Sequence, residues 1–71
     1  MRDYELLSRK LIRYAGEADI SIPTEFKLPD GYKMLGKPVD WGDGEFAFKK
    51  VVWYSKALQS RIVEVYRLKV E

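Results

Sequence analysis

A chain of 71 residues, 46% of them hydrophobic, can form one small domain over residues 1–71, but without cysteine no disulfide can stabilise it. The absence of histidine and cysteine also excludes the usual ligand sets for zinc, haem and iron–sulfur clusters, so we expect no metal and no cofactor. The net charge of +2 combines an acidic middle, residues 16–45, with two basic ends, unlike the one-sided positive field of a DNA-coating protein.

No segment has the pattern of a targeting signal or a membrane span. The charged start leads into no apolar stretch of signal-peptide length, and the longest markedly apolar run, residues 51–54, is far too short to cross a bilayer. These features predict a cytoplasmic protein. The chain also has no asparagine and a single glutamine, Gln59, beside many lysine, arginine and glutamate residues, which is typical of heat-adapted proteins.

The first predicted element is an α-helix over residues 3–15. Apolar residues recur there at intervals of three and four, which would place them on one face of a helix: Tyr4, Leu7, Leu11, Tyr14 and Ala15. Asp3 is a suitable N-cap, and Gly16 is a suitable left-handed stop. The segment therefore predicts an N-terminal helix that packs on the rest of the chain.

The middle of the chain predicts turns and short strands. Residues 17–24 should be a connector or a short edge strand, because Pro23 lacks a backbone N–H and forces the residue before it into an extended conformation. In the Pro-Asp-Gly turn at residues 29–31, proline presets the first turn angle and Gly31 supplies a positive φ. Alternating apolar residues on both sides complete a predicted hairpin over residues 26–34, and residues 40–44 form another turn or loop.

The last third predicts two long strands, residues 45–55 and 61–70, joined through residues 56–60. A high content of β-branched and aromatic side chains favours strands here. Residues 51–65 also fit helical spacing, so a helix is the alternative for this region. The predicted fold class is α+β, an N-terminal helix packed on a small antiparallel β-meander of three to four strands.

The sequence contains no recognisable catalytic constellation. Asp40, Asp43 and Glu45 share a glycine-containing loop, but their spacing does not match an EF-hand. The serines have no histidine to activate them, and the glycines of the same loop lie in an acidic stretch that would repel phosphate. We therefore expect a protein that is not an enzyme.

The apolar pattern of the two long strands predicts a protein interface. The alternation slips by one residue near residues 49–50 and again near residues 65–66, which would put apolar side chains on opposite faces at the two ends of the hairpin. If Tyr54 lies opposite Ile62, the turn-end patch is Val51, Trp53, Val63 and Val65, and the open-end patch is Phe46, Phe48, Leu68 and Val70.

One helix can cover only one of these two patches. We expect the open-end patch to be the core, because it is the larger contiguous apolar set, and the turn-end patch to meet a partner, with Trp53 as the anchor. The predicted function is thus a small interaction module that self-associates or forms part of a protein complex.

The alternative function is sequence-tolerant nucleic-acid binding by a basic, aromatic sheet surface. Aromatic side chains stand among lysines and arginines in the last third of the chain, and several RNA- and single-strand-binding modules use sheet aromatics beside cations in this way. The candidate phosphate contacts are Lys49, Arg67 and Lys69. Against this reading, strand aromatics are usually core, strand lysines usually protect edges, and no RNP-type run is present.

Overall fold

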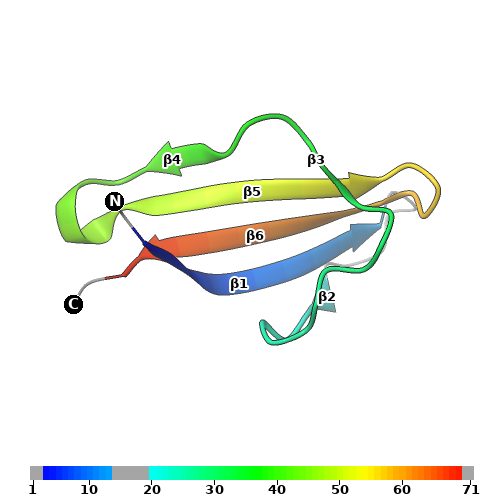
Figure 1. Cartoon of the computed structure of the whole chain (residues 1–71), viewed down its shortest axis with the longest axis horizontal. Coiled ribbons are helices and arrows are strands. Elements are labelled where there is room, and N and C mark those ends of the chain that lie inside the picture. Colours follow the sequence, from blue (N-terminus) through cyan, green and yellow to red (C-terminus); the bar gives the residue numbers. More distant parts are fainter. Residues whose placement is uncertain (1–2, 14–19, 70–71) are drawn as a thin grey trace.

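Three long antiparallel strands form the centre of the molecule (Figure 1). The computed structural model describes residues 3–13 and 20–69. The long strands are β1 (Tyr4–Arg13), β5 (Phe48–Ser55) and β6 (Ser60–Leu68). The short strands are β2 (Ile20–Ser21), β3 (Lys33–Met34) and β4 (Val39–Trp41). All six belong to one antiparallel sheet of order β2-β1-β6-β5-β3, in which β4 also pairs with β5.

Helical structure is nearly absent from the part of the chain that the structure describes. Its one helical element is a three-residue 3-10 turn, η1 (Gly44–Phe46). Within residues 3–13 and 20–69 there is accordingly no helix with the length and apolarity needed to cross a membrane.

The predicted N-terminal helix is wrong, and with it the α+β fold class, because residues 4–13 form strand β1. This strand pairs with β6, and the register shifts between Leu6 and Ser8, so Leu7 is the extra residue of a β-bulge. A bulge interrupts the two-residue alternation of a strand, which explains why the apolar residues here imitate helical spacing. The predicted helix end at residues 14–16 lies outside the described residues.

The two predicted long strands are confirmed, and the helix alternative for residues 51–65 is wrong. The first strand begins three residues later than predicted, because η1 occupies residues 44–46. The β5–β6 ladder has no bulge, and Trp53 lies opposite Ile62 in place of the expected Tyr54. A shift of one residue exchanges the two faces of a strand, so this register decides which side chains gather on each face.

Strand alternation gives the three long strands two unlike faces. All of their buried residues lie on one, which we call the covered face: Arg9, Val51, Ser55, Ser60, Ile62 and Glu64. The other, which we call the open face, contains no buried residue of these strands. Its members are Glu5, Ser8, Lys10, Ile12, Phe48, Lys50, Val52, Tyr54, Arg61, Val63, Val65 and Arg67.

Residues 22–32, which we call the strap, cross the covered face on their way from β2 to β3 (Figure 1). β2 pairs with β1 at one side of the sheet and β3 pairs with β5 at the other, so the strap spans the strands between them. Arg9 donates a hydrogen bond to the Phe26 carbonyl, and the Tyr32 and Ser60 hydroxyls are hydrogen-bonded to each other. The buried apolar core is small and consists of Ala47, Val51 and Ile62.

The middle of the chain matches the predicted turns better than the predicted hairpin. Gly31 has the expected positive φ, +91°, but β3 pairs with β5 and not with residues 26–28, so the hairpin over residues 26–34 is wrong. The edge strand expected within residues 17–24 is present as β2. Of the loop expected at residues 40–44, the first two residues belong to β4.

Two glycines with the same backbone conformation allow a matched test of this architecture. Gly42 (φ +89°) has no room for a side chain, because a Cβ would lie 1.9 Å from the Phe46 carbonyl oxygen, whereas Gly31 has nothing within 4 Å. We expect Gly31→Ala to lower the free energy of unfolding by about 1 kcal/mol through backbone strain alone. Gly42→Ala should cost at least about 1 kcal/mol more, because η1 must move. Urea unfolding measures both, and equal losses would contradict the close approach.

Candidate functional site

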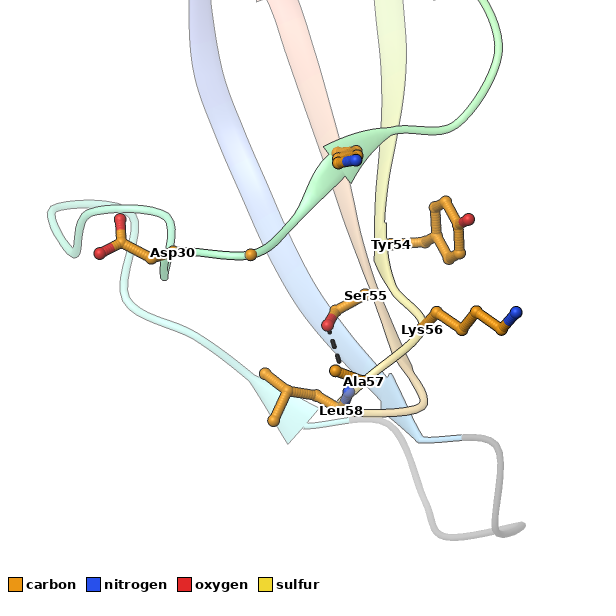
Figure 2. Close-up of a pocket in the computed structure, with 8 residues that line it drawn as sticks. Asp30, Tyr54, Ser55, Lys56, Ala57 and Leu58 are labelled. Atoms are coloured by element: carbon orange, nitrogen blue, oxygen red, sulfur yellow. Dashed lines mark hydrogen bonds between the residues drawn. The ribbon is translucent and has the colours of Figure 1, made fainter.

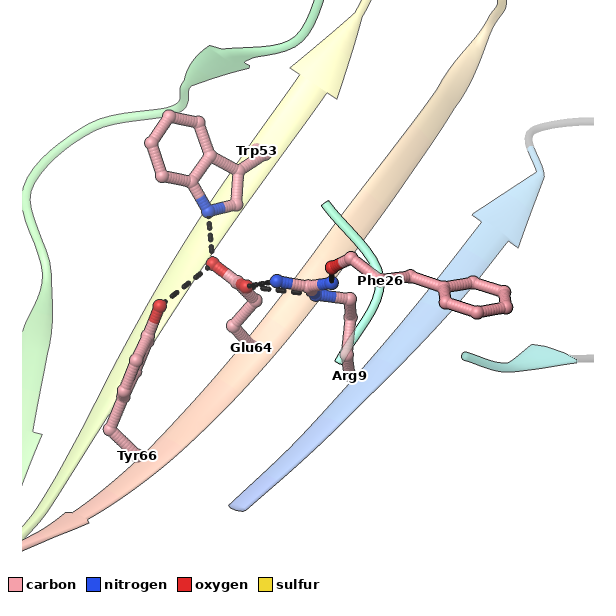
Figure 3. Close-up of polar contacts among 5 residues, drawn as sticks. All are labelled: Arg9, Phe26, Trp53, Glu64 and Tyr66. Carbon is pink, nitrogen blue, oxygen red and sulfur yellow. Dashed lines mark hydrogen bonds and ion pairs between the residues drawn. The ribbon is translucent and has the colours of Figure 1, made fainter. Parts of the chain in front are cut away.

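A buried polar network centred on Glu64 occupies the covered face (Figure 3). Glu64 Oε2 accepts hydrogen bonds from Arg9 Nε at 2.9 Å and Arg9 Nη2 at 2.7 Å. Glu64 Oε1 accepts from the Trp53 indole N–H and from the Tyr66 hydroxyl. The Arg9 and Glu64 side chains are only 9% and 3% exposed, so this ion pair is shielded from water.

The network binds the strap to the sheet. Arg9 contacts Glu64 with one side of its guanidinium group and the Phe26 carbonyl with the other (Figure 3). Burial, and then the neighbouring Glu64 carboxylate, raises the pKa of the Tyr66 phenol above its ordinary value of 10.0, in keeping with a phenol that donates to Glu64. Both Glu64 oxygens are already occupied by donors, so we assign the network a structural role.

The open face combines an aliphatic centre with a surround of cations. Its half-buried aliphatic residues are Ile12, Val52, Val63 and Val65. Its cations are Lys10, Lys50, Arg61 and Arg67, all exposed. Glu5 is the one carboxylate that the three long strands place on this face, and it pairs with Arg67 at 2.7 Å. The face therefore carries four positive charges and one negative charge.

Aromatic side chains gather where β4 extends the open face. Trp41 lies opposite Phe48, and their rings are stacked with centroids 5.3 Å apart and planes at 16°. Beside them is an open hollow of about 660 Å³, which we call the aromatic hollow. It is lined by Glu5, Leu7, Glu45, Phe46, Phe48, Arg67, Leu68 and Lys69. This end of the sheet offers apolar ring surface next to charged groups.

A second open hollow, of about 510 Å³, lies at the turn between β5 and β6 (Figure 2). Ser55 is the serine in its wall, and its Oγ accepts a hydrogen bond from the Leu58 backbone N–H at 3.2 Å. That hydroxyl therefore holds the turn together. The chain has no histidine that could activate this serine.

The predicted turn-end patch does not form, because its members lie on opposite faces. Val51 and Trp53 are on the covered face, where Trp53 belongs to the Glu64 network, whereas Val63 and Val65 are on the open face. The prediction of a shared face is thus wrong by one residue of register. Contact of either pair with a protein partner remains a prediction.

The predicted open-end core is also wrong. Phe46 lies in η1 with 72% of its surface exposed, and Phe48 and Leu68 are half-buried. Val70 lies outside the described residues. The strap covers the opposite face, so the buried residues of the long strands are there and not around Phe48.

Of the three predicted phosphate contacts, two lie on the side of the open face. Arg67 belongs to that face, and Lys69 lines the aromatic hollow. Lys49 belongs to the covered face, where its ammonium lies 4.7 Å from the ring centroid of Tyr4 and 5.0 Å from that of Tyr66. These two cation–π contacts give Lys49 a packing role on the covered face.

Three cations of the open face were not predicted as phosphate contacts: Lys50 and Arg61, which belong to the basic residues of the last third, and Lys10, which lies outside that region. The signal for two of them was present, since Lys50 and Arg61 each stand two residues before a valine of the open face. Lys10 could not be found in this way, because its segment was predicted as a helix.

The acidic loop residues form no metal site among the described residues. Asp40 lies in β4 opposite Lys49, whereas Asp43 and Glu45 belong to the segment around η1. No group of three or more potential metal-ligating side chains occurs within residues 3–13 and 20–69.

Comparison with known proteins yields no relative. No protein-family model matches the chain, and no curated protein or solved structure is significantly similar to it.

Proposed function

We propose that the protein binds nucleic acid through the open face of its sheet, without catalysis and without sequence preference. The observation that carries the proposal is the combination of exposed cations with the stacked Trp41–Phe48 pair on one uncovered sheet surface. Cations attract a phosphate backbone whatever its sequence, and ring surfaces on a sheet stack bases of every type.

The cations are spread over all three long strands, as an extended phosphate chain requires. Lys10 of β1 lies opposite Val63, and Lys50 of β5 lies opposite Val65, so the two lysines flank β6 from both sides. Arg61 is on β6 itself, two residues before Val63. Adjacent strands are about 4.8 Å apart, which puts these three side chains within reach of one ligand. Their apolar stems can lie on the aliphatic centre while their charged ends contact phosphate.

Binding of a fluorescein-labelled oligo(dT) strand, measured by anisotropy over a series of salt concentrations, tests the proposal. We expect binding at low salt that weakens steeply as salt increases, with a log–log slope of about −2 if three phosphates are contacted. Failure of the protein to bind any single- or double-stranded oligonucleotide at low salt would remove this function.

A protein interface on the same face is the second candidate. The aliphatic centre favours it, because the described residues of one chain leave Ile12, Val52, Val63 and Val65 only half-buried, and contiguous apolar surface marks interaction sites. Two copies that met through this face would bring like charges together, so added salt should strengthen self-association while it weakens nucleic-acid binding. Solution mass measured over the same salt series, without oligonucleotide, distinguishes the two candidates.

A further inference from the structure

The aromatic hollow exposes far more apolar surface than the centre of the open face. Phe46 is 72% exposed, Leu7 46% and Trp41 44%. Leu7 and Phe46 line the hollow together with Phe48, on which Trp41 is stacked. Exposed large apolar side chains that cluster at one place mark a binding site more often than scattered ones do.

Backbone hydrogen bonds and a close glycine contact fix the backbone position of Phe46. The Phe46 N–H donates to the Asp43 carbonyl at 2.9 Å, and the Leu68 N–H donates to the Ala47 carbonyl at 2.9 Å, which ties the end of η1 to β6. Gly42 packs so closely against the Phe46 carbonyl that no side chain fits between them. The exposed ring thus projects from a hydrogen-bonded turn, so its backbone needs no reordering when a ligand stacks on it.

The charged groups of the hollow favour a base over a purely apolar occupant. Arg67 and Lys69 line it and can contact the phosphates on either side of a base. Glu45 lines it as well and can accept a hydrogen bond from an N–H of a base, such as the N3–H of thymine. Glu5 also lines the hollow, but it is paired with Arg67, so Lys69 and Glu45 are the charged groups that an aliphatic occupant would leave without a partner from the ligand.

We propose that the aromatic hollow is a subsite for one unpaired base, so that the ligand of the open face is single-stranded nucleic acid. This inference rests on the proposed function. A base within a duplex is stacked and paired, and its ring surface cannot reach an aromatic side chain, whereas the bases of a single strand can turn out and stack. The cations of the open face would then hold the phosphates that lead away from the hollow.

Phe46→Ala tests the subsite, with Phe26→Ala as the matched control. Phe26 is 58% exposed but belongs to the strap on the other side of the sheet. We expect Phe46→Ala to weaken binding of oligo(dT) on the order of tenfold, the usual effect of losing one base–aromatic stack, and to leave the salt slope unchanged. Phe26→Ala should bind like the wild type. Equal affinities of the two variants would overturn the subsite.

Two further ligands keep the result independent of how well the variants fold. A strand of abasic deoxyribose phosphates of equal length should bind the wild-type protein at least as weakly as oligo(dT) binds Phe46→Ala, because it has no base to stack on any ring. A DNA duplex of the same length should also bind without a contribution from base stacking on Phe46, because its bases are paired and stacked on each other. If the wild type binds the abasic strand or the duplex as tightly as oligo(dT), the base subsite is wrong while the proposed function stands. If it binds none of the three ligands, the proposed function fails first.

Discussion

Glu64→Gln should lower the free energy of unfolding by about 3 kcal/mol or more, enough to unfold much of the protein at room temperature. The reason lies with its partner: the Arg9 side chain carries a guanidinium group and is 9% exposed, so the substitution leaves a buried charge without a counter-charge. Glutamine also replaces one acceptor oxygen by an NH₂ group that faces the donors of the network. A core of this size supplies a total stability of about 3–5 kcal/mol, so little would remain.

Glu5→Gln is the matched control, because Glu5 and Arg67 form an ion pair of the same length on the surface. Both pairs have an N–O distance of 2.7 Å, but the Arg67 and Glu5 side chains are 51% and 41% exposed. A surface pair of this kind contributes less than about 1 kcal/mol. Urea unfolding followed by far-ultraviolet circular dichroism compares the two variants with the wild type. Similar losses in both would show that burial of the Glu64 network does not stabilise the fold.

Simultaneous replacement of Lys10, Lys50 and Arg61 by serine should weaken oligo(dT) binding on the order of a hundredfold at low salt. These side chains are exposed and lie on three adjacent strands of the open face, so the chain should still fold. Each phosphate contact with a single strand contributes about −0.7 to the log–log salt slope, and loss of three should flatten it by about 2. Arg67, paired with Glu5, would be the main cation left on this face.

A second triple variant separates the open face from the overall charge of the protein. Replacement of Lys27, Lys37 and Lys56 by serine removes the same three charges, and all three lysines are exposed outside the long strands. We expect this variant to retain most of its affinity and its salt slope, because long-range fields between exposed charges are screened. Equal losses in the two triple variants, measured by the same anisotropy titration, would place binding elsewhere than on the open face.

The candidate site could be predicted only in part. The aromatic and basic residues of the last third are visible in the sequence, and the structure places Arg67 on the open face. Lys49 lies on the covered face, because its face depends on strand register, and its ammonium contacts the ring of Tyr4 on another strand. The Glu64 network was invisible in the sequence, since Arg9 and Glu64 are 55 residues apart and exposed ion pairs use the same residue types.

The sequence by itself determined the strands β5 and β6 and the left-handed turn at Gly31. Both follow from local preferences: β-branched side chains favour a pleated strand, and glycine accepts a positive φ without strain. Its lack of cysteine and histidine likewise left no zinc or haem ligands of the usual kinds.

Only the tertiary structure decided that residues 4–13 form a strand and which side chains lie on each face of the sheet. The leucines, the arginines and the lysine of β1 have high helix propensity, but the strand is stabilised by backbone hydrogen bonds to β6. The bulge at Leu7 interrupts the two-residue period by which the strand could have been recognised. The β5–β6 register is set by the turn before Ser60, where Gln59 adopts a positive φ of 47°. Glutamine rarely adopts a positive φ, and the paired strands on both sides of the turn hold Gln59 in this conformation.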